Sequence, residues 1–211
     1  MPNGKIQKTT SPNARPVSPN NPCPFLRGLV AQGALADDVE PLRQVAKVIT
    51  ATALKGEGAP KVPAAAIYGV ALIANGLSPL SVLKTQSIGL RLNQLRASPL
   101  NKHGVGSGIL DAKGKISQTN LKRLRSFASE KTDKDGKIEL GFSLAELTIF
   151  MDANFERAAG KRRLVDRKMM DAEWPVLLKV IGKEGNQGRY LSLVDVETLF
   201  VERQLPKRMQ D

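Results

Sequence analysis

Cysteine and histidine are almost absent from this chain, which has one residue of each, Cys23 and His103, among 211 residues. A single cysteine excludes an internal disulfide and any zinc site built from several thiolates. A single histidine leaves little for a zinc enzyme, a histidine-ligated metal centre or a Ser-His-Asp triad. A catalyst made from this chain must therefore use carboxylates, the lone thiol or a cofactor.

Aromatic residues are also scarce, at 4% of the chain. Few aromatic rings make a stacking platform for single-stranded nucleic acid hard to assemble. The net charge of +12 nevertheless raises the question of nucleic acid or acidic membranes. No zinc-finger spacing, RNP signature or basic zipper appears, so we interpret the basic residues as a solvated face and expect no nucleic-acid recognition.

Long apolar runs are missing as well. The run at 64–74 is well short of the roughly 20 residues that span a bilayer. Residues 1–21 lack the apolar core of a secretion signal, so we expect a cytoplasmic protein without membrane contact. The same residues are rich in Pro, Asn, Ser and Thr and contain no acid, which predicts a disordered basic arm. We expect one globular domain over residues 22–211.

Helical spacing of apolar residues dominates the rest of the chain. Ser143 followed by Glu146 forms a capping box that predicts the start of one helix. Alternating apolar and polar runs are scarce, so the sequence predicts an all-α fold, one helical globule with little or no sheet. The predicted helices cover residues 38–54, 63–74, 77–92, 117–129, 143–158, 163–181 and 192–203, with a loop at 101–114.

The segment around Asp133, Asp135 and Gly136 resembles the middle of a calcium-binding loop. Counting Gly136 as the sixth loop position puts Lys131 first and Phe142 last. The loop needs a carboxylate at its first position and a bidentate glutamate at its twelfth, so both key ligands are missing. We expect a plain Asp-Gly turn.

Cys23 stands between Pro22 and Pro24, directly before an apolar run at helical spacing. Pro24 suits the first residue of a helix, which makes Cys23 its N-cap. The sulfur then faces free backbone N–H groups and the positive end of the helix dipole, which favours the thiolate. The alternatives are a small buried residue at a helix start and a nucleophilic or redox cysteine, although the chain has no second thiol to resolve an oxidised sulfur.

The motif Pro22-Cys23-Pro24-x-Leu26-x-x-Leu29-x-x-x-Gly33-x-Leu35 resembles the proximal segment of the heme-thiolate peroxidases, namely the chloroperoxidases and unspecific peroxygenases. Three further stretches agree in order and rough spacing: Leu100-Asn101-Lys102-His103, Glu173 nine residues before Gly182, and Phe200 before Leu205-Pro206. The resemblance implies heme b as the cofactor, with Cys23 as the axial ligand of its iron and Pro22 and Pro24 beside it.

The resemblance also implies that Glu173 is the distal acid–base group, which takes a proton from hydrogen peroxide and returns it to the departing oxygen. Its neighbours Trp174, Val176 and Leu177 could form a partly apolar pocket that holds its pKa near the working pH. The expected product is an oxidised, oxygenated or halogenated small organic molecule. The sequence does not indicate an oligomeric state.

One part of the family pattern is missing. After Leu-Asn-x-His the family carries Glu-His-Asp and a serine, which hold a divalent cation against a heme propionate. Here the stretch reads Ser107-Gly108-Ile109, and Asp111 stands where the serine would fall. Asp111 and Ser107 are then the only oxygen ligands left for Mg²⁺, fewer than that ion prefers. We interpret His103 as a polar loop residue.

This departure leaves two alternatives to a peroxidase. A non-catalytic heme binder, such as a sensor or carrier, would bind heme but turn over negligible peroxide. A basic helical module without cofactor would bind nucleic acid or an acidic protein in a salt-sensitive way.

Overall fold

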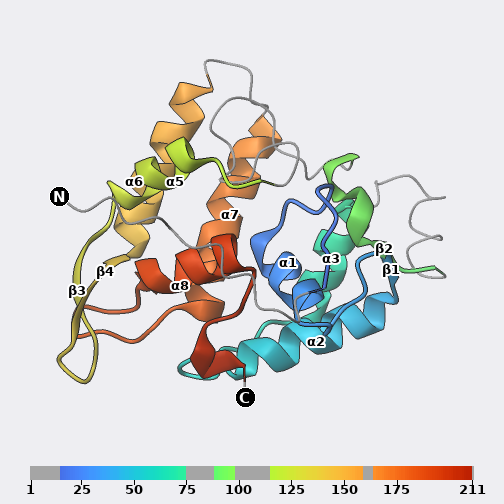
Figure 1. Cartoon of the computed structure of the whole chain (residues 1–211), viewed down its shortest axis with the longest axis horizontal. Helices are drawn as coiled ribbons and strands as arrows, with labels where there is room; N and C mark the ends of the chain where they lie inside the picture. Colours follow the sequence, from blue (N-terminus) through green and yellow to red (C-terminus); the bar gives the residue numbers. More distant parts are fainter. Residues whose placement is uncertain (1–14, 75–87, 98–114, 159–163, 211) are drawn as a thin grey trace.

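The computed structural model describes residues 15–74, 88–97, 115–158 and 164–210 (Figure 1). Most of these residues are helical, and α1 lies between α7 and α3 (Figure 1). The helices are α1 (Pro24–Ala31), α2 (Leu42–Leu54), α3 (Ala64–Ala74), η1 (Leu92–Ala97), α5 (Gln118–Arg125), α6 (Leu144–Arg157), α7 (Leu164–Ile181), α8 (Leu193–Glu197), the π-helix η2 (Thr198–Glu202) and η3 (Lys207–Met209).

The helices predicted at 38–54, 63–74, 117–129, 143–158, 163–181 and 192–203 are confirmed with ends shifted by a few residues, but the described end of the helix predicted at 77–92 contains a strand at Leu90–Arg91. The capping box is present, because Glu146 accepts the backbone N–H of Ser143 at 2.6 Å and closes the first turn of α6. Most of the helix predicted at 77–92 and the loop predicted at 101–114 lie outside the described residues.

The prediction of an all-α fold with little or no sheet is wrong. Two antiparallel sheets are present, one formed by β1 (Val39–Glu40) and β2 (Leu90–Arg91), the other by β3 (Ser129–Thr132), β4 (Ile138–Phe142) and β5 (Leu191–Ser192) in the order β3-β4-β5. The strands are short, so each leaves only a few residues of period-two pattern. Patterning arguments need longer runs than these to separate a strand from a loop.

The β3–β4 hairpin shows why the residue pattern did not predict this sheet. The Asp-Gly turn was predicted correctly: Gly136 has φ +81°, and the Asp133 carboxylate accepts the backbone N–H of both Asp135 and Lys137 at 2.9 Å. In the strand that follows the turn, apolar side chains face solvent instead of the core. Ile138 and Leu140 of β4 face solvent, 63% and 47% exposed.

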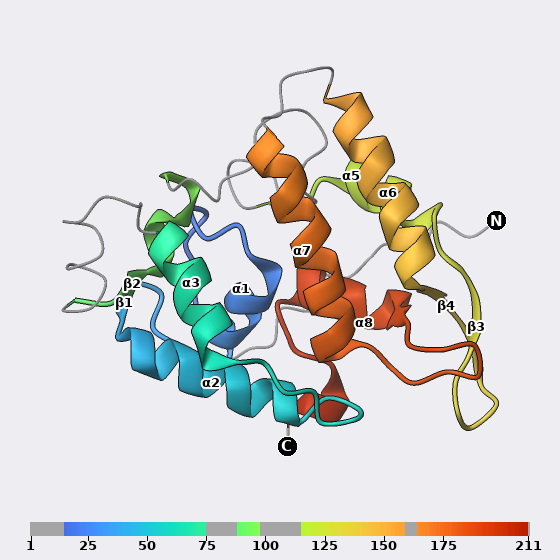
Figure 2. The ribbon, with the colours of Figure 1, turned by 180° about the vertical axis from the view of Figure 1, so that it is seen from behind.

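The four helices α5 to α8 form two helix–strand–helix units. The first runs α5, β3, β4, α6 and the second runs α7, β5, α8 (Figure 2). They join where Phe142 of β4 pairs with Leu191 of β5, and both side chains are fully buried. One hydrophobic core extends from these units to α1, α2 and α3.

Helix α1 is the most deeply enclosed helix of the first half. Seven of its eight residues are buried. Part of the segment predicted as an arm packs against it, since the Arg15 N–H donates to the carbonyl of Ala31 at 2.9 Å and Asn21 is fully buried. Residues 1–14 lie outside the described residues. No helix within the described ranges is long and apolar enough to cross a membrane, as predicted.

Candidate functional site

Cys23 occupies the N-cap of α1, as predicted, and Pro24 follows as the first helical residue. Its backbone is extended, with φ −77° and ψ 114°, and its N–H donates to Oδ1 of Asn21 at 3.3 Å. The residue is partly buried and packs against the hydrophobic core. The sulfur is therefore carried at the positive end of an enclosed helix, where negative charge is stabilised.

Arginine side chains surround the start of α1. Arg27, one turn after Cys23, is 2% exposed, and its guanidinium donates to the backbone carbonyls of Ser18 and Asn21 at 2.9 and 3.0 Å. Burial lowers the pKa of Arg27 to about 10, and the nearby positive charges of Arg203 and Arg96 act in the same direction. A negative charge at Asp37 or at Cys23 acts in the opposite direction, so the sulfur lies within electrostatic range of this guanidinium.

The chain before Cys23 is held by η1. The backbone N–H of Arg96 donates to the carbonyl of Asn20 at 2.9 Å, and its Nε donates to the carbonyl of Pro19 at 2.7 Å. Pro22 lies in this held segment, immediately before the cysteine. Sequence reasoning missed the contributions of Arg27 and Arg96, because nothing in a sequence places residue 96 against residue 19.

Asn21 carries a buried donor that is not used within the described structure. Its side-chain oxygen accepts the Cys23 N–H, which fixes the orientation of the amide, and its Nδ2 has no hydrogen-bond partner there. A buried amide N–H without an acceptor costs about 1–3 kcal/mol. The donor is therefore suited to an acceptor that a ligand brings.

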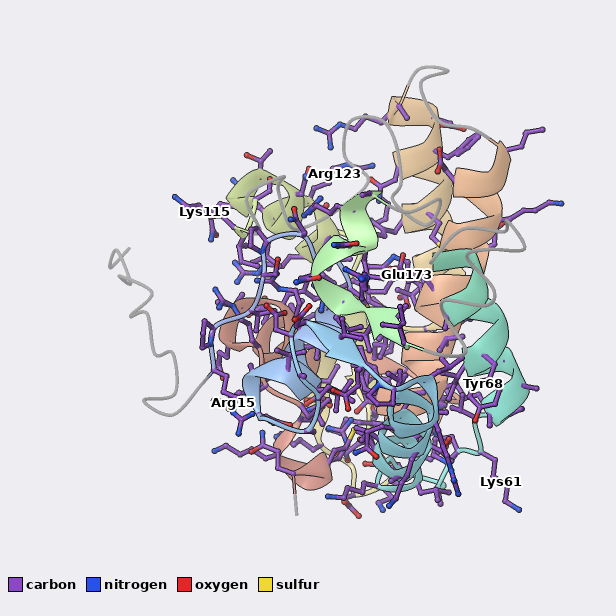
Figure 3. All side chains as sticks on the ribbon, turned by 90° about the vertical axis from the view of Figure 1, so that its right-hand side faces the viewer. Arg15, Lys61, Tyr68, Lys115, Arg123 and Glu173 are labelled. Carbon is purple, nitrogen blue, oxygen red and sulfur yellow. The ribbon has the colours of Figure 1, made fainter. Side chains whose placement is uncertain are left out.

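Glu173 lies on α7 and is partly buried (Figure 3). The neighbours named from the sequence as its pocket differ in burial. Trp174 is 7% exposed and packs into the core, with ring centroids 5.6 Å from Phe150 and 6.1 Å from Phe200. Val176 is 51% exposed and faces away from that cluster. Cys23 and Glu173 thus come from two helices that share one core.

The remaining predicted site residues, His103, Ser107 and Asp111, lie outside the described residues, so their arrangement stays a prediction. Within the described ranges, no group of three or more His, Cys, Asp or Glu side chains could hold a metal ion. At the Asp-Gly turn, the ammonium group of Lys183 pairs with Glu139 and lies 3.9 Å from Asp133.

No family model, curated protein or solved structure matches the chain.

Proposed function

We propose that the protein binds heme b through the thiolate of Cys23 and uses hydrogen peroxide to oxidise, oxygenate or halogenate a small organic molecule. The observation that carries the proposal is the position of Cys23 at the N-terminus of the enclosed helix α1, beside the buried guanidinium of Arg27. A thiol that forms no disulfide suits the reducing cytoplasm, where we place the protein.

The residues around Cys23 fit a thiolate-bound heme. A thiolate is a good axial ligand for heme iron, and the helix terminus and Arg27 both stabilise its charge. The buried Nδ2 of Asn21 is a donor beside the cysteine that the described residues leave without an acceptor. A negatively charged sulfur or a heme carboxylate would supply one.

Bound heme would supply the iron at which the peroxide O–O bond is cleaved, a step that electron donation by the thiolate favours. Glu173 would hold the proton that leaves the incoming peroxide and return it to the departing oxygen. Its partly buried position on α7 removes the carboxylate from part of the solvent.

The ligand is tested by titrating the purified protein with hemin and recording the absorption spectrum of the ferrous carbon monoxide complex. Thiolate ligation gives a strongly red-shifted Soret band. We expect this band in the wild type and in His103→Ala, which removes the only imidazole, and its loss in Cys23→Ala. A red-shifted band that survives Cys23→Ala, or no stoichiometric hemin uptake by the wild type, contradicts the proposal.

The acid–base role is tested by peroxide turnover of the hemin-loaded protein. Glu173→Gln keeps the shape of the side chain and removes its proton exchange, so we expect turnover to fall by a factor of about 100. Glu156→Gln on the exposed face of α6 is the matched control and should leave turnover unchanged. Equal turnover in both variants removes Glu173 from the reaction, and heme binding without turnover in the wild type would indicate a carrier or sensor.

A further inference from the structure

An open hollow of about 520 Å³ lies where the end of α1, the end of α2 and the C-terminal segment meet. Its volume falls within the range of about 300–1,000 Å³ that small-molecule sites occupy. Its lining is mixed: Leu29, Leu205 and Met209 belong to it but are each at most 3% exposed, while Gln32, Ala34 and Lys55 are exposed. Neither Cys23 nor Glu173 lines this hollow, so it is separate from the proposed heme site.

The charged groups of the hollow are all positive. Lys55 and Arg203 line it, and the described lining residues include no aspartate or glutamate. Neither cation makes an ion pair with another residue in the described part of the chain. Arg203 is partly buried, and its charge is close enough to Arg27 to lower the pKa of that residue. A partly desolvated cation that faces like charge is stabilised by an anion.

The backbone of Arg203 supports a binding role. Its φ and ψ are 57° and 39°, the left-handed region, which a long side chain rarely adopts. It directly follows η2, a π-helix of five residues, and the Gln204 N–H closes the turn on the carbonyl of Thr198 at 3.2 Å. Both features cost conformational free energy and concentrate at functional sites. Here they set the cationic side chain of Arg203 at the wall of the hollow.

We propose that this hollow binds a small organic anion with an apolar body, namely a carboxylate whose head pairs with Arg203 and Lys55. The exposed Ala34 and the aliphatic stem of Lys55 contact the apolar part. The proposal is independent of heme, because the hollow is formed entirely by residues other than Cys23 and Glu173.

The test is a titration of the ¹⁵N-labelled full chain with octanoate, followed by two-dimensional NMR. We expect the amide signals of Gly33 and Gln204, which flank the hollow, to shift and saturate. Octanol and octylamine carry the same chain with no charge and with the opposite charge. Both should bind at least about threefold more weakly, the effect of one partly exposed charge pair. Equal affinity for octanol, or no saturable shift with octanoate, overturns the proposal.

Variants separate the two cations from the general positive charge of the surface. Lys55→Met and Arg203→Gly should each weaken octanoate binding about threefold, and the double variant about tenfold. Glycine at 203 accepts the left-handed backbone, so this variant should fold at least as well as the wild type. Lys47→Met removes an exposed cation of α2 outside the hollow and should leave the affinity unchanged. Unchanged affinity in the double variant, or equal loss in Lys47→Met, overturns the assignment.

Discussion

The two halves of the chain use their charged side chains differently. In the C-terminal half, residues 115–210, opposite charges pair: Arg125 with Glu197 at 2.5 Å, Arg208 with Asp195 at 2.6 Å, and Lys131 with Glu146 at 2.8 Å. In the N-terminal half, residues 15–97, Arg27 is buried among backbone carbonyls and close to further positive charge.

This difference suggests that the charged side chains of the two halves have different roles, in stability and in binding. Oppositely charged side chains that pair stabilise each other, so removal of one partner lowers the free energy of unfolding. Where cationic side chains outnumber carboxylates, the excess positive charge stabilises a bound anion or a nearby thiolate. We therefore expect the polar contacts of the C-terminal half to contribute to stability, and the cations around α1 to contribute to the binding proposed above.

The largest effect is expected from Glu139→Ala. Glu139 accepts hydrogen bonds from the Tyr190 hydroxyl at 2.7 Å, the Ser192 hydroxyl at 3.1 Å and the Lys183 ammonium group. Removal leaves a largely buried cation and two hydroxyls without their acceptor, so the free energy of unfolding should fall by about 3 kcal/mol. Urea denaturation measures the loss. The exposed Glu130→Ala is the control, and equal losses in the two variants would break the comparison.

A somewhat smaller loss is expected from Arg189→Met. The Arg189 guanidinium donates to the carbonyls of Leu178 and Lys179 in the last turn of α7 and to that of Gly182, the residue after the helix, each at 2.9 Å. These bonds tie the C-terminal end of α7 to a side chain beyond the helix, so their loss should cost about 2 kcal/mol. Hydrogen exchange of the last turn of α7 should accelerate in this variant. Protection equal to that of the exposed-residue variant Lys179→Met would contradict the role.

The pH dependence of stability reports the contribution of the Glu146 carboxylate. Burial alone would raise the pKa of Glu146, but hydrogen bonds from Lys131, Ser129 and Ser143 outweigh it and lower the value from 4.5 to about 2. Because the folded pKa is depressed, this stabilisation is present above pH 4.5 and is lost as the pH falls toward 2. The contribution is about 1–2 kcal/mol after allowance for partial exposure.

Glu146→Gln tests this, since glutamine preserves the capping box but not the charge. Urea denaturation should show the wild type more stable above pH 4.5 and the two proteins converging as the pH falls toward 2. A difference between the two proteins that does not vary with pH would show that the carboxylate charge of Glu146 contributes nothing.

The smallest change in stability is expected from Cys23→Ser. Serine is a favourable N-cap, so the free energy of unfolding should change by less than about 0.5 kcal/mol. The same variant should lose thiolate ligation of hemin completely. A large fall in stability would mean that Cys23 is a packing residue, and the division between folding and binding would not hold.

Several elements could be predicted from local pattern. The capping box of Ser143 and Glu146 and the Asp-Gly turn depend on contacts within a few residues, and both are formed. The start of α1 at Pro24 has the same local origin, because proline lacks the N–H that a first helical residue does not need.

The sheet depended on distant contacts. Glu139 faces inward only because Lys183, Tyr190 and Ser192, more than forty residues later, arrive to satisfy it. Its neighbours Ile138 and Leu140 are thereby turned to solvent, against the usual orientation of apolar strand residues. A pattern that assumes apolar residues face the core cannot assign this strand.

The sequence by itself determined the positions of most helices, the turn at Gly136 and the placement of Cys23 at a helix N-terminus, because these depend on neighbours in the chain. Only the tertiary structure decided that Arg96 and Arg203 approach Arg27, and that Lys55 and Arg203 line the same hollow. The physical reason is that electrostatic energy depends on separation in space, which residues far apart in sequence acquire only when the core forms.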